Sequence, residues 1–304
     1  RPTLPANSAW LAQLTITASA IAAVNDLADR VFTAPFTPPA GVWTVDSTAR
    51  WTFERGGSLT VGGDVLTIRA CIIADDHQTI FMGTLTNLRL EYCAASRVPL
   101  PWFGANGTDT ISDSTFIRGW LSAVRSQGGF LYAPPGIYRY TTGIDLNVYA
   151  KTTIECAGTR NTIFQNDGTA NALFKTGDQT NAKYMTFKHC GFDMNGYNVA
   201  DFASFLSILG DNAGNFASNI RVLDNHMYDS AYPGDATVMQ RIYINVLDVR
   251  DAWVQRNHLE NGGRIKVGRP GRRIYVTHNI VDTINDNGIV CVNTGAGVGA
   301  LITE

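Results

Sequence analysis

The C-terminal half of the chain repeats one pattern four times, and this repeat limits the folds that the sequence can adopt. The four segments read YMTFKHCGFD, NIRVLDNHMYD, DAWVQRNHLEN and RIYVTHNIVDT. In each, an apolar residue is followed three positions later by a corner residue, and two positions after that by a second apolar residue. The first apolar positions are Phe187, Val222, Val254 and Val276, the corners are Cys190, Asn225, Asn257 and Asn279, and the second apolar positions are Phe192, Met227, Leu259 and Val281.

One more short apolar segment lies between repeats, as in SFLSIL and GRIKVG, and the corners are 35, 32 and 22 residues apart. Three short strands in a unit of about 22 residues at minimum are typical of one coil of a parallel β-helix. Asparagine tolerates the left-handed backbone of a tight corner, and stacked asparagine side chains can hydrogen-bond between coils. The strands of a β-sandwich also alternate apolar and polar residues, but a sandwich does not repeat a corner residue at a fixed position in each unit. We therefore predict an all-β fold, a right-handed single-stranded parallel β-helix.

The composition is compatible with this fold. Charged residues make up 16% of the chain, and the formal net charge is −2. The charged share is low beside the roughly 25% of ordinary soluble domains, and the abundant Gly, Asn and Thr suit many tight corners. The weak net charge argues against a general nucleic-acid binder, and because no apolar run approaches about 20 residues we expect no membrane span.

The cysteines are scattered, without a C-x-x-C pair or a zinc-ligand spacing. They are Cys71, Cys93, Cys156, Cys190 and Cys291. We expect buried, reduced thiols, as in a protein that folds in a reducing cytoplasm. No metal or cofactor is predicted, since the ADDH stretch at Asp75, Asp76 and His77 has no partner ligand nearby and is typical of a polar turn.

The first 40 residues are expected to form a helix and a linker. Residues 8–32 carry apolar residues at heptad spacing, which predicts either a short coiled coil that joins several chains or a helix packed on its own domain. The spaced residues are Leu14, Thr17, Ile21, Val24, Ala28 and Val31. A short β segment is predicted over 41–98 and the β-helix over 99–304. The chain starts at Arg1 and stops within a coil, so we expect it to be part of a longer protein whose further coils and trimer-forming tail follow.

A second helix is predicted within residues 112–129, SDSTFIRGWLSAVRSQGG. Ser112 is the expected cap and Gly128 the expected end. The expected buried stripe consists of Phe116, Trp120, Leu121 and Val124. The strand in GGFLYAPPGIY then begins the first coil.

Two phrases, WFGANGTDTISDST and GGFLYAPPGIY, resemble those with which pectate-lyase-like β-helices open their coils, WFGA-x-GDG-x-TDDT and GG-x-hydrophobic-PPGTY. The matching residues are Trp102, Phe103, Gly104, Ala105, Gly107, Asp113, Gly128, Gly129, Pro134, Pro135, Gly136 and Tyr138. Thr108, Asp109 and Ser112 depart from the acidic run, which looks structural in the family. The resemblance covers roughly residues 43–295. It implies a helix that caps the first coil, and it points to bacteriophage tailspikes and polysaccharide-degrading enzymes.

Coils that stack about 4.8 Å apart bring residues of equal phase into columns on the outer face. Three such columns follow from the repeat. They are Thr186, Arg221, Trp253 and Tyr275, then Gly191, His226, His258 and Ile280, and finally Asp193, Tyr228, Glu260 and Asp282.

Candidate site residues come from these columns. Trp253 and Tyr275 are predicted to offer a flat face to sugar rings, with Arg221, Tyr228 and Asp193 as further substrate-binding residues. Glu260 and Asp282 would lie roughly 5 Å apart, near the carboxyl separation of retaining glycosidases, and His258 would support them as base or donor. A solvated polar face is the alternative for these groups. The basic stretch RIKVGRPGRR at 264–273 could bind an anionic polysaccharide or a neighbouring subunit, or form a solvated loop.

Three functions remain open. The first is a phage tailspike or tail fibre in the virion, a homotrimer that joins other tail or baseplate proteins and binds and cleaves host capsule, lipopolysaccharide or exopolysaccharide. The second is a secreted bacterial polysaccharide lyase or glycoside hydrolase. The third is a non-catalytic adhesive or structural virion protein. Fold alone does not decide among them.

Overall fold

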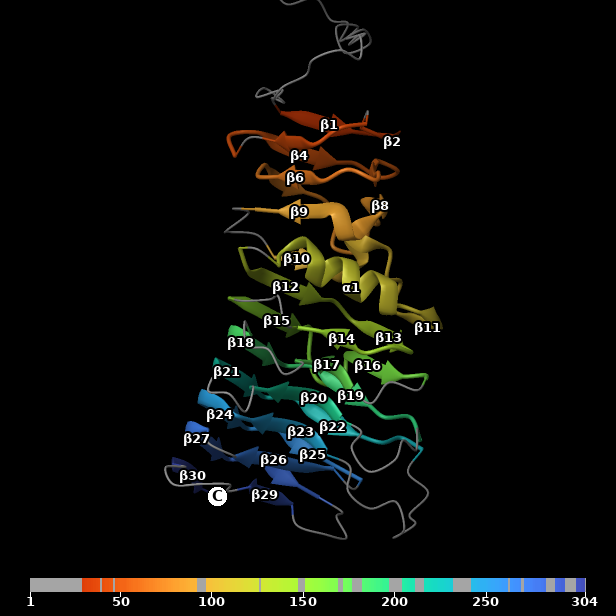
Figure 1. Ribbon diagram of the computed structural model, residues 1–304. Helices are drawn as coiled ribbons and strands as arrows, with labels where there is room; N and C mark the ends of the chain where they lie inside the picture. Colours follow the sequence, from red (N-terminus) through yellow and green to blue (C-terminus); the bar gives the residue numbers. More distant parts are fainter. Residues whose placement is uncertain are drawn as a thin grey trace, which may run out of the picture.

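The structure is a computed structural model. It describes residues 29–303 apart from 39, 46, 92–96, 126, 147–150, 169–171, 177–181, 197–203, 211–215, 232–241, 262, 269–270, 283–287 and 293–298. Across this part of the chain, short parallel strands stack into a long column (Figure 1). None of the helices described is long and apolar enough to cross a membrane.

The N-terminal stack consists of three small parallel sheets. They are β1 (Arg30–Phe32), β4 (Arg50–Phe53) and β7 (Cys71–Ile73); β2 (Pro35–Phe36), β5 (Ser58–Val61) and β8 (Phe81–Gly83); and β3 (Trp43–Val45), β6 (Leu66–Ile68) and β9 (Leu88–Leu90). Strands β1 and β2 come before residue 40 in the chain and pair with β4 and β5, which come after it. Among the described residues, this stack therefore begins at Arg30.

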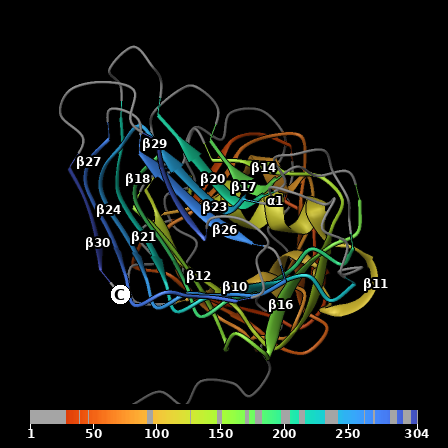
Figure 2. The same cartoon turned by 90° about the horizontal axis from the view of Figure 1, so that it is seen from below.

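The C-terminal stack consists of three longer sheets, which the chain visits in turn (Figure 2). Sheet I contains β10 (Val98–Pro99), β12 (Gly129–Ala133), β15 (Thr152–Cys156), β18 (Lys183–Lys188), β21 (Ala217–Leu223), β24 (Val249–Gln255), β27 (Arg272–Thr277) and β30 (Gly299–Thr303). Sheet II contains β11 (Thr108–Ser112), β13 (Gly136–Tyr140), β16 (Thr162–Asn166), β19 (Gly191–Asp193), β22 (His226–Tyr228), β25 (His258–Leu259) and β28 (Ile280–Val281). Sheet III contains β14 (Ile144–Asp145), β17 (Ala172–Lys175), β20 (Ser204–Leu209), β23 (Ile242–Leu247), β26 (Arg264–Gly268) and β29 (Ile289–Val292).

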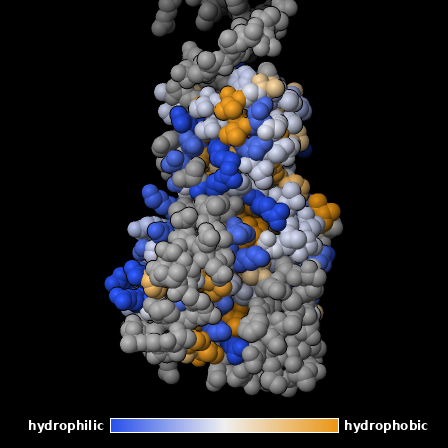
Figure 3. Space-filling view, in the orientation of Figure 1, coloured by the Kyte–Doolittle hydropathy of each residue, from blue (hydrophilic) through white to orange (hydrophobic). Residues whose placement is uncertain are grey.

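The predicted superposition of coils is confirmed. Val222 pairs with Val254, which pairs with Val276, and all three side chains have no exposed surface. Met227 likewise pairs with Leu259. Apolar residues fill the column from coil to coil, whereas on the face drawn in Figure 3 apolar side chains form only small separate patches among hydrophilic ones. The described residues thus form the all-β parallel β-helix that the repeat predicts.

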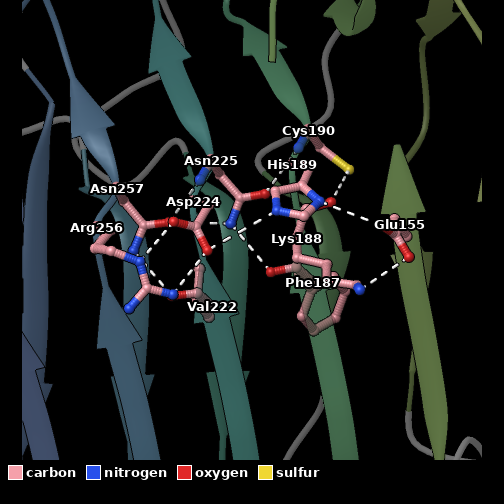
Figure 4. A network of polar contacts seen from close by, with 10 residues as sticks. All are labelled: Glu155, Phe187, Lys188, His189, Cys190, Val222, Asp224, Asn225, Arg256 and Asn257. Carbon is pink, nitrogen blue, oxygen red and sulfur yellow. Dashed lines mark hydrogen bonds and ion pairs between the residues drawn. The ribbon is translucent and has the colours of Figure 1, made fainter. Parts of the chain in front are cut away.

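An asparagine ladder joins the coils at the corner between sheets I and II (Figure 4). The Nδ2 of Asn225 donates to Asn257 Oδ1 over 3.0 Å and to the carbonyl of Phe187 over 3.1 Å. Asn257 repeats this pattern with Asn279 Oδ1 and the carbonyl of Val222. The predicted hydrogen bonding between stacked asparagines is confirmed.

The expected left-handed conformation lies one residue earlier than predicted. Positive φ belongs to the residues that precede the ladder, which are His189, Asp224, Arg256 and His278, with φ between 54° and 60°. The asparagines are therefore selected by the hydrogen bonds of their side chains rather than by backbone conformation.

The prediction of buried, reduced cysteines is wrong for the residues described. Cys156 and Cys190 form a disulfide between consecutive coils, and Cys71 and Cys291 are exposed. Cys93 lies outside the described residues. Cys190 occupies the ladder phase, and its backbone N–H donates to Asn225 Oδ1 over 3.0 Å. The disulfide thus replaces the asparagine link at the head of the ladder.

The predicted N-terminal helix falls mostly on residues 1–28, outside the described residues. Its predicted end is wrong, because Arg30–Phe32 form strand β1 instead. Val31, expected on the apolar stripe, is 61% exposed. Phe32 points inward and stacks on Phe53 with ring centroids 4.6 Å apart.

The predicted second helix is present as α1 (Ser114–Ala123), and its N-cap residue is Asp113 rather than Ser112. Trp120, Leu121 and Val124 are buried as expected, while Phe116 is only half-buried. The N–H of Gly128, at φ 78°, donates to the carbonyl of Val124 over 2.8 Å. The helix contacts the 3-10 turns η2 (Leu85–Asn87) and η3 (Leu100–Phe103) and strand β14, so it lies between the two stacks (Figure 1).

Candidate functional site

The strand register contains every member of the first two predicted columns and, in the third, the pair of Asp193 and Tyr228; Glu260 and Asp282 directly follow their strands. Arg221 pairs with Trp253 and Trp253 with Tyr275 on sheet I. His226 pairs with His258 on sheet II. The columns divide into two groups of side chains on adjacent sheets, which are described separately below.

The first group, the histidine–carboxylate cluster, consists of His226, His258, Glu260 and Asp282. The Nε2 atoms of His226 and His258 each lie 3.2 Å from Glu260 Oε1. His258 Nε2 also lies 2.7 Å from Asp282 Oδ2. Both predicted carboxylates therefore contact one imidazole nitrogen, and a second imidazole joins them.

The backbone fixes each member of the cluster. Glu260 and Asp282 directly follow β25 and β28, and their N–H groups donate to the carbonyls of Met227 and Leu259 over 2.9 and 2.7 Å. The rings of His226 and His258 are stacked, with centroids 5.1 Å apart and planes at 22°. Tyr228 stacks on His226 within the same strand, with centroids 4.8 Å apart. The order of the coils thus brings four polar groups into one small volume.

Burial affects the ionisation of His226 and of its neighbour Tyr228. The His226 side chain is 12% exposed, and its Nε2 is within ion-pair distance of Glu260 without the alignment of a hydrogen bond. Burial lowers the pKa of His226, and the negative charge of Glu260 opposes this shift only in part. Burial, with the charges of Asp193 and Glu260, raises the pKa of Tyr228 to about 12. His226 and Tyr228 are therefore neutral near pH 7.

The cluster is chemically suited to two tasks. Carboxylates on one imidazole are an arrangement for proton transfer. Alternatively, His226 Nε2, His258 Nε2 and a Glu260 oxygen all lie within 4.8 Å of one another, the only such group of possible metal ligands in the described part of the chain. His226 was not among the predicted site residues, although its phase, one coil before His258, was a sufficient signal.

The second group is a stack of Arg221, Trp253 and Tyr275 on sheet I. The Trp253 and Tyr275 rings are 5.8 Å apart with planes at 18°, and the Arg221 guanidinium carbon lies 5.2 Å from the Trp253 ring centroid. Because Arg221 and Tyr275 come from the coils on either side of Trp253, they cover its two faces. The structure brings the three residues together as predicted, but as a row of rings rather than one flat face.

Further cations surround this row. Arg250 and Arg272 are paired in the register of β24 and β27, and both are exposed, as is Arg221. Asp251 on the same sheet is held by Arg273 in a two-point ion pair. We call the surface of Arg221, Arg250, Arg272, Trp253 and Tyr275 the basic–aromatic face.

The basic stretch 264–273 does not form one cluster. Arg264 and Lys266 lie in β26 of sheet III, whereas Arg272 and Arg273 lie in β27 of sheet I. Arg269 lies outside the described residues. Of these residues, only Arg272 belongs to the basic–aromatic face.

The prediction that Asp193 is an outward substrate-binding residue is wrong. Asp193 is 2% exposed, and its carboxylate accepts hydrogen bonds from the Gln165 side chain, the Asn195 N–H and both the N–H and the hydroxyl of Ser230. Gln165 and Ser230, from the coils before and after it, cover the carboxylate. Tyr228 in the same column remains half-buried against His226.

The two groups lie on different sheets. Trp253 is in β24, His258 begins β25, and the left-handed corner at Arg256 and Asn257 separates them. The ADDH stretch is a turn as predicted, in which Asp75 Oδ1 accepts from the N–H of His77 over 2.8 Å and Asp76 pairs with Arg97.

Comparison with known proteins identifies no relative. No family model matches this chain, and neither the curated proteins nor the solved structures contain a match.

Proposed function

We propose that this protein binds an anionic polysaccharide on the basic–aromatic face. The observation that carries the proposal is the stacked row of Arg221, Trp253 and Tyr275, with Arg250 and Arg272 exposed on the same sheet. Guanidinium groups bind carboxylates through paired hydrogen bonds, and exposed aromatic edges add apolar contact with sugar rings. A repeating acidic sugar fits a surface that itself repeats from coil to coil.

The biological setting that we propose is a phage tailspike or tail fibre. The support is the opening phrase at residues 102–138 and its likeness to pectate-lyase-like proteins. On the same support we propose right-handed winding of the coils, with α1 as the cap of the first coil of the C-terminal stack. We also propose a homotrimer that is attached to other tail proteins in the virion. Its ligand would be a host capsule, lipopolysaccharide or exopolysaccharide. A secreted lyase or hydrolase and a non-catalytic adhesin are the alternatives.

Cleavage of the polysaccharide is a second candidate activity. The contact of Glu260 and Asp282 with the same nitrogen of His258 favours it, because two carboxylates and an imidazole can divide the roles of general acid and base. The corner between the sheets means that a chain bound along the basic–aromatic face would have to cross Asn257 to reach these groups.

The binding proposal is tested with immobilised capsule, lipopolysaccharide and exopolysaccharide preparations, and with polygalacturonate and dextran as acidic and neutral probes. We expect an acidic polymer to bind and dextran not to bind. Arg221→Gln and Trp253→Leu should each weaken binding about tenfold, the effect of one charge-assisted or buried contact. Lys175→Gln, an exposed cation lost from sheet III, is the matched control. Equal binding by all variants would refute the assignment of the face.

A further inference from the structure

We propose that the histidine–carboxylate cluster is a binding site for a divalent transition metal ion, with zinc as the preferred ion. The ligands are His226 Nε2, His258 Nε2 and a Glu260 oxygen, and Asp282 supplies the fourth ligand. The proposal does not depend on polysaccharide binding, because the two sites lie on different sheets.

The distances between the side chains support this assignment. Zinc binds imidazole nitrogen and carboxylate oxygen at about 2.0 to 2.2 Å in a tetrahedron, which places neighbouring ligand atoms about 3.3 Å apart. Both histidine nitrogens lie 3.2 Å from Glu260 Oε1, and His258 Nε2 lies 2.7 Å from Asp282 Oδ2. The three atoms of His226, His258 and Glu260 remain within 4.8 Å of one another. Asp282 lies outside this group of three, and its side chain, which is 54% exposed, has to rotate to join them around one ion.

The scaffold holds these ligands in place before any ion arrives. The N–H of His258 donates to the carbonyl of Asn225 over 2.8 Å, and Asn257, the preceding residue, is a member of the asparagine ladder. Tyr228 packs on one side of His226, and His258 packs on the other. Preorganised ligands lose little conformational freedom when they bind an ion.

The donor set favours a transition metal. Glu260 and Asp282 both contact His258 Nε2, and a divalent cation offsets their two negative charges. Imidazole nitrogens suit zinc and its neighbours in the periodic table, whereas calcium and magnesium prefer a shell made of oxygen alone. His226 Nε2, which has no hydrogen bond, gains a partner when the ion binds.

The test uses the full chain without an affinity tag, treated with a chelator and then desalted. Zinc is titrated against a chromophoric chelator, and bound metal is counted by elemental analysis. We expect one zinc per chain at this site, and cobalt in its place should show the intense visible absorption of a tetrahedral complex. Magnesium and calcium at the same concentration should not displace the zinc.

Substitutions then assign the site. His226→Gln and His258→Gln should each weaken zinc binding by at least about 100-fold, and Asp282→Asn by about tenfold, the range over which metal-site changes act. His278→Gln, at an exposed corner position, and His189→Gln, at a half-buried corner position where the imidazole contacts Glu155, are the matched controls and should keep full affinity. Circular dichroism of the metal-free variants reports whether each one folds.

Two results would overturn the proposal. One is a folded wild-type chain that binds no zinc, and the other is zinc binding that His258→Gln leaves unchanged. Zinc should also raise the thermal midpoint of the wild type but not of folded His258→Gln, because only the native site binds the ion. A wild-type chain that binds zinc but binds no acidic polysaccharide would refute the function proposed above and leave the metal site intact.

Discussion

The side-chain nitrogen of Asn257 donates to the side-chain oxygen of Asn279 over 3.0 Å, although the two residues are 22 positions apart in the chain. Asn257 is 1% exposed, donates also to the carbonyl of Val222 and accepts from the N–H and side chain of Asn225. One buried amide therefore satisfies polar groups of the two neighbouring coils and links them to its own.

Replacement of Asn257 by alanine should destabilise the protein strongly. The change leaves the buried N–H of Asn225 without its acceptor, and each unsatisfied buried group costs about 1 to 3 kcal/mol, so we expect a loss of about 3 kcal/mol in the free energy of unfolding. Urea titration followed by circular dichroism measures it. Asn161→Ala, at an exposed position, should cost less than about 0.5 kcal/mol. A similar loss in both variants would contradict the role of the ladder.

The Cys156–Cys190 disulfide should be found by peptide mapping under non-reducing conditions. Because it closes a loop of 34 residues, the double variant Cys156→Ala/Cys190→Ala should lose about 2 to 4 kcal/mol of stability. Cys71 and Cys291 should react with a thiol reagent in the native protein, since both are exposed. Cys71→Ala, which breaks no link between coils, is the control for the stability measurement.

The stability of the protein should fall as pH rises from about 4 to 6, through the titration of Asp113. This carboxyl group has no exposed surface, and burial raises its pKa to about 6 from an ordinary 3.8. A raised folded-state pKa means that the native protein holds a proton that the unfolded chain releases first, so the loss is complete above the folded value. Asp113→Asn should remove this pH dependence and gain about 3 kcal/mol at pH 7. Unfolding curves of both proteins at pH 4 and 7 provide the measurement, and parallel pH profiles would speak against the prediction.

Asp193→Asn should reduce stability rather than polysaccharide binding. The amide replaces a carboxylate oxygen that faces protein donors on both sides, so at least one donor loses its partner at a cost of about 2 kcal/mol. Ser230→Ala, which removes only one of the donors, should cost less. If the folded Asp193→Asn protein instead bound the polymer tenfold more weakly at unchanged stability, the sequence prediction would be restored.

Loss of cleavage should follow from Glu260→Gln or Asp282→Asn if the cluster acts as an acid–base pair. New reducing ends or unsaturated uronates, measured with the polymer that binds, report the reaction. Because Glu260 is also a proposed metal ligand, cleavage is measured with and without zinc. Activity that survives both substitutions would exclude these carboxylates from the reaction.

The coil pattern could be predicted from the sequence because the ladder repeats one residue type at one phase. The equal position of Asn225, Asn257 and Asn279 within the repeat predicts that they stack. His226 and His258 each follow one of these asparagines, so they are predicted to stack as well. The disulfide could not be predicted in the same way. Cys156 and Cys190 are far apart in the sequence, and only the superposition of coils brings them into contact. Cys190 at an asparagine phase was the one available hint.

The errors at the ends of elements have a common cause. Alternation predicts the direction of a side chain but not whether its neighbours cover it, and Gln165 and Ser230 cover the carboxylate of Asp193. The position of Val31 is compatible both with a helix of heptad pattern and with a strand. The pairing of β1 with β4 makes this segment a strand. Tertiary contacts settle such positions, and periodicity alone does not.

Each hydrogen-bonded pair of asparagines, one rung of the ladder, fixes where a coil starts and ends. The number of residues in the chain between two rungs can therefore vary. Asn225 to Asn257 takes 32 residues and Asn257 to Asn279 takes 22, yet the amides meet in the same geometry. Evolution can therefore lengthen, shorten or replace the segments between the rungs while the interior is left untouched.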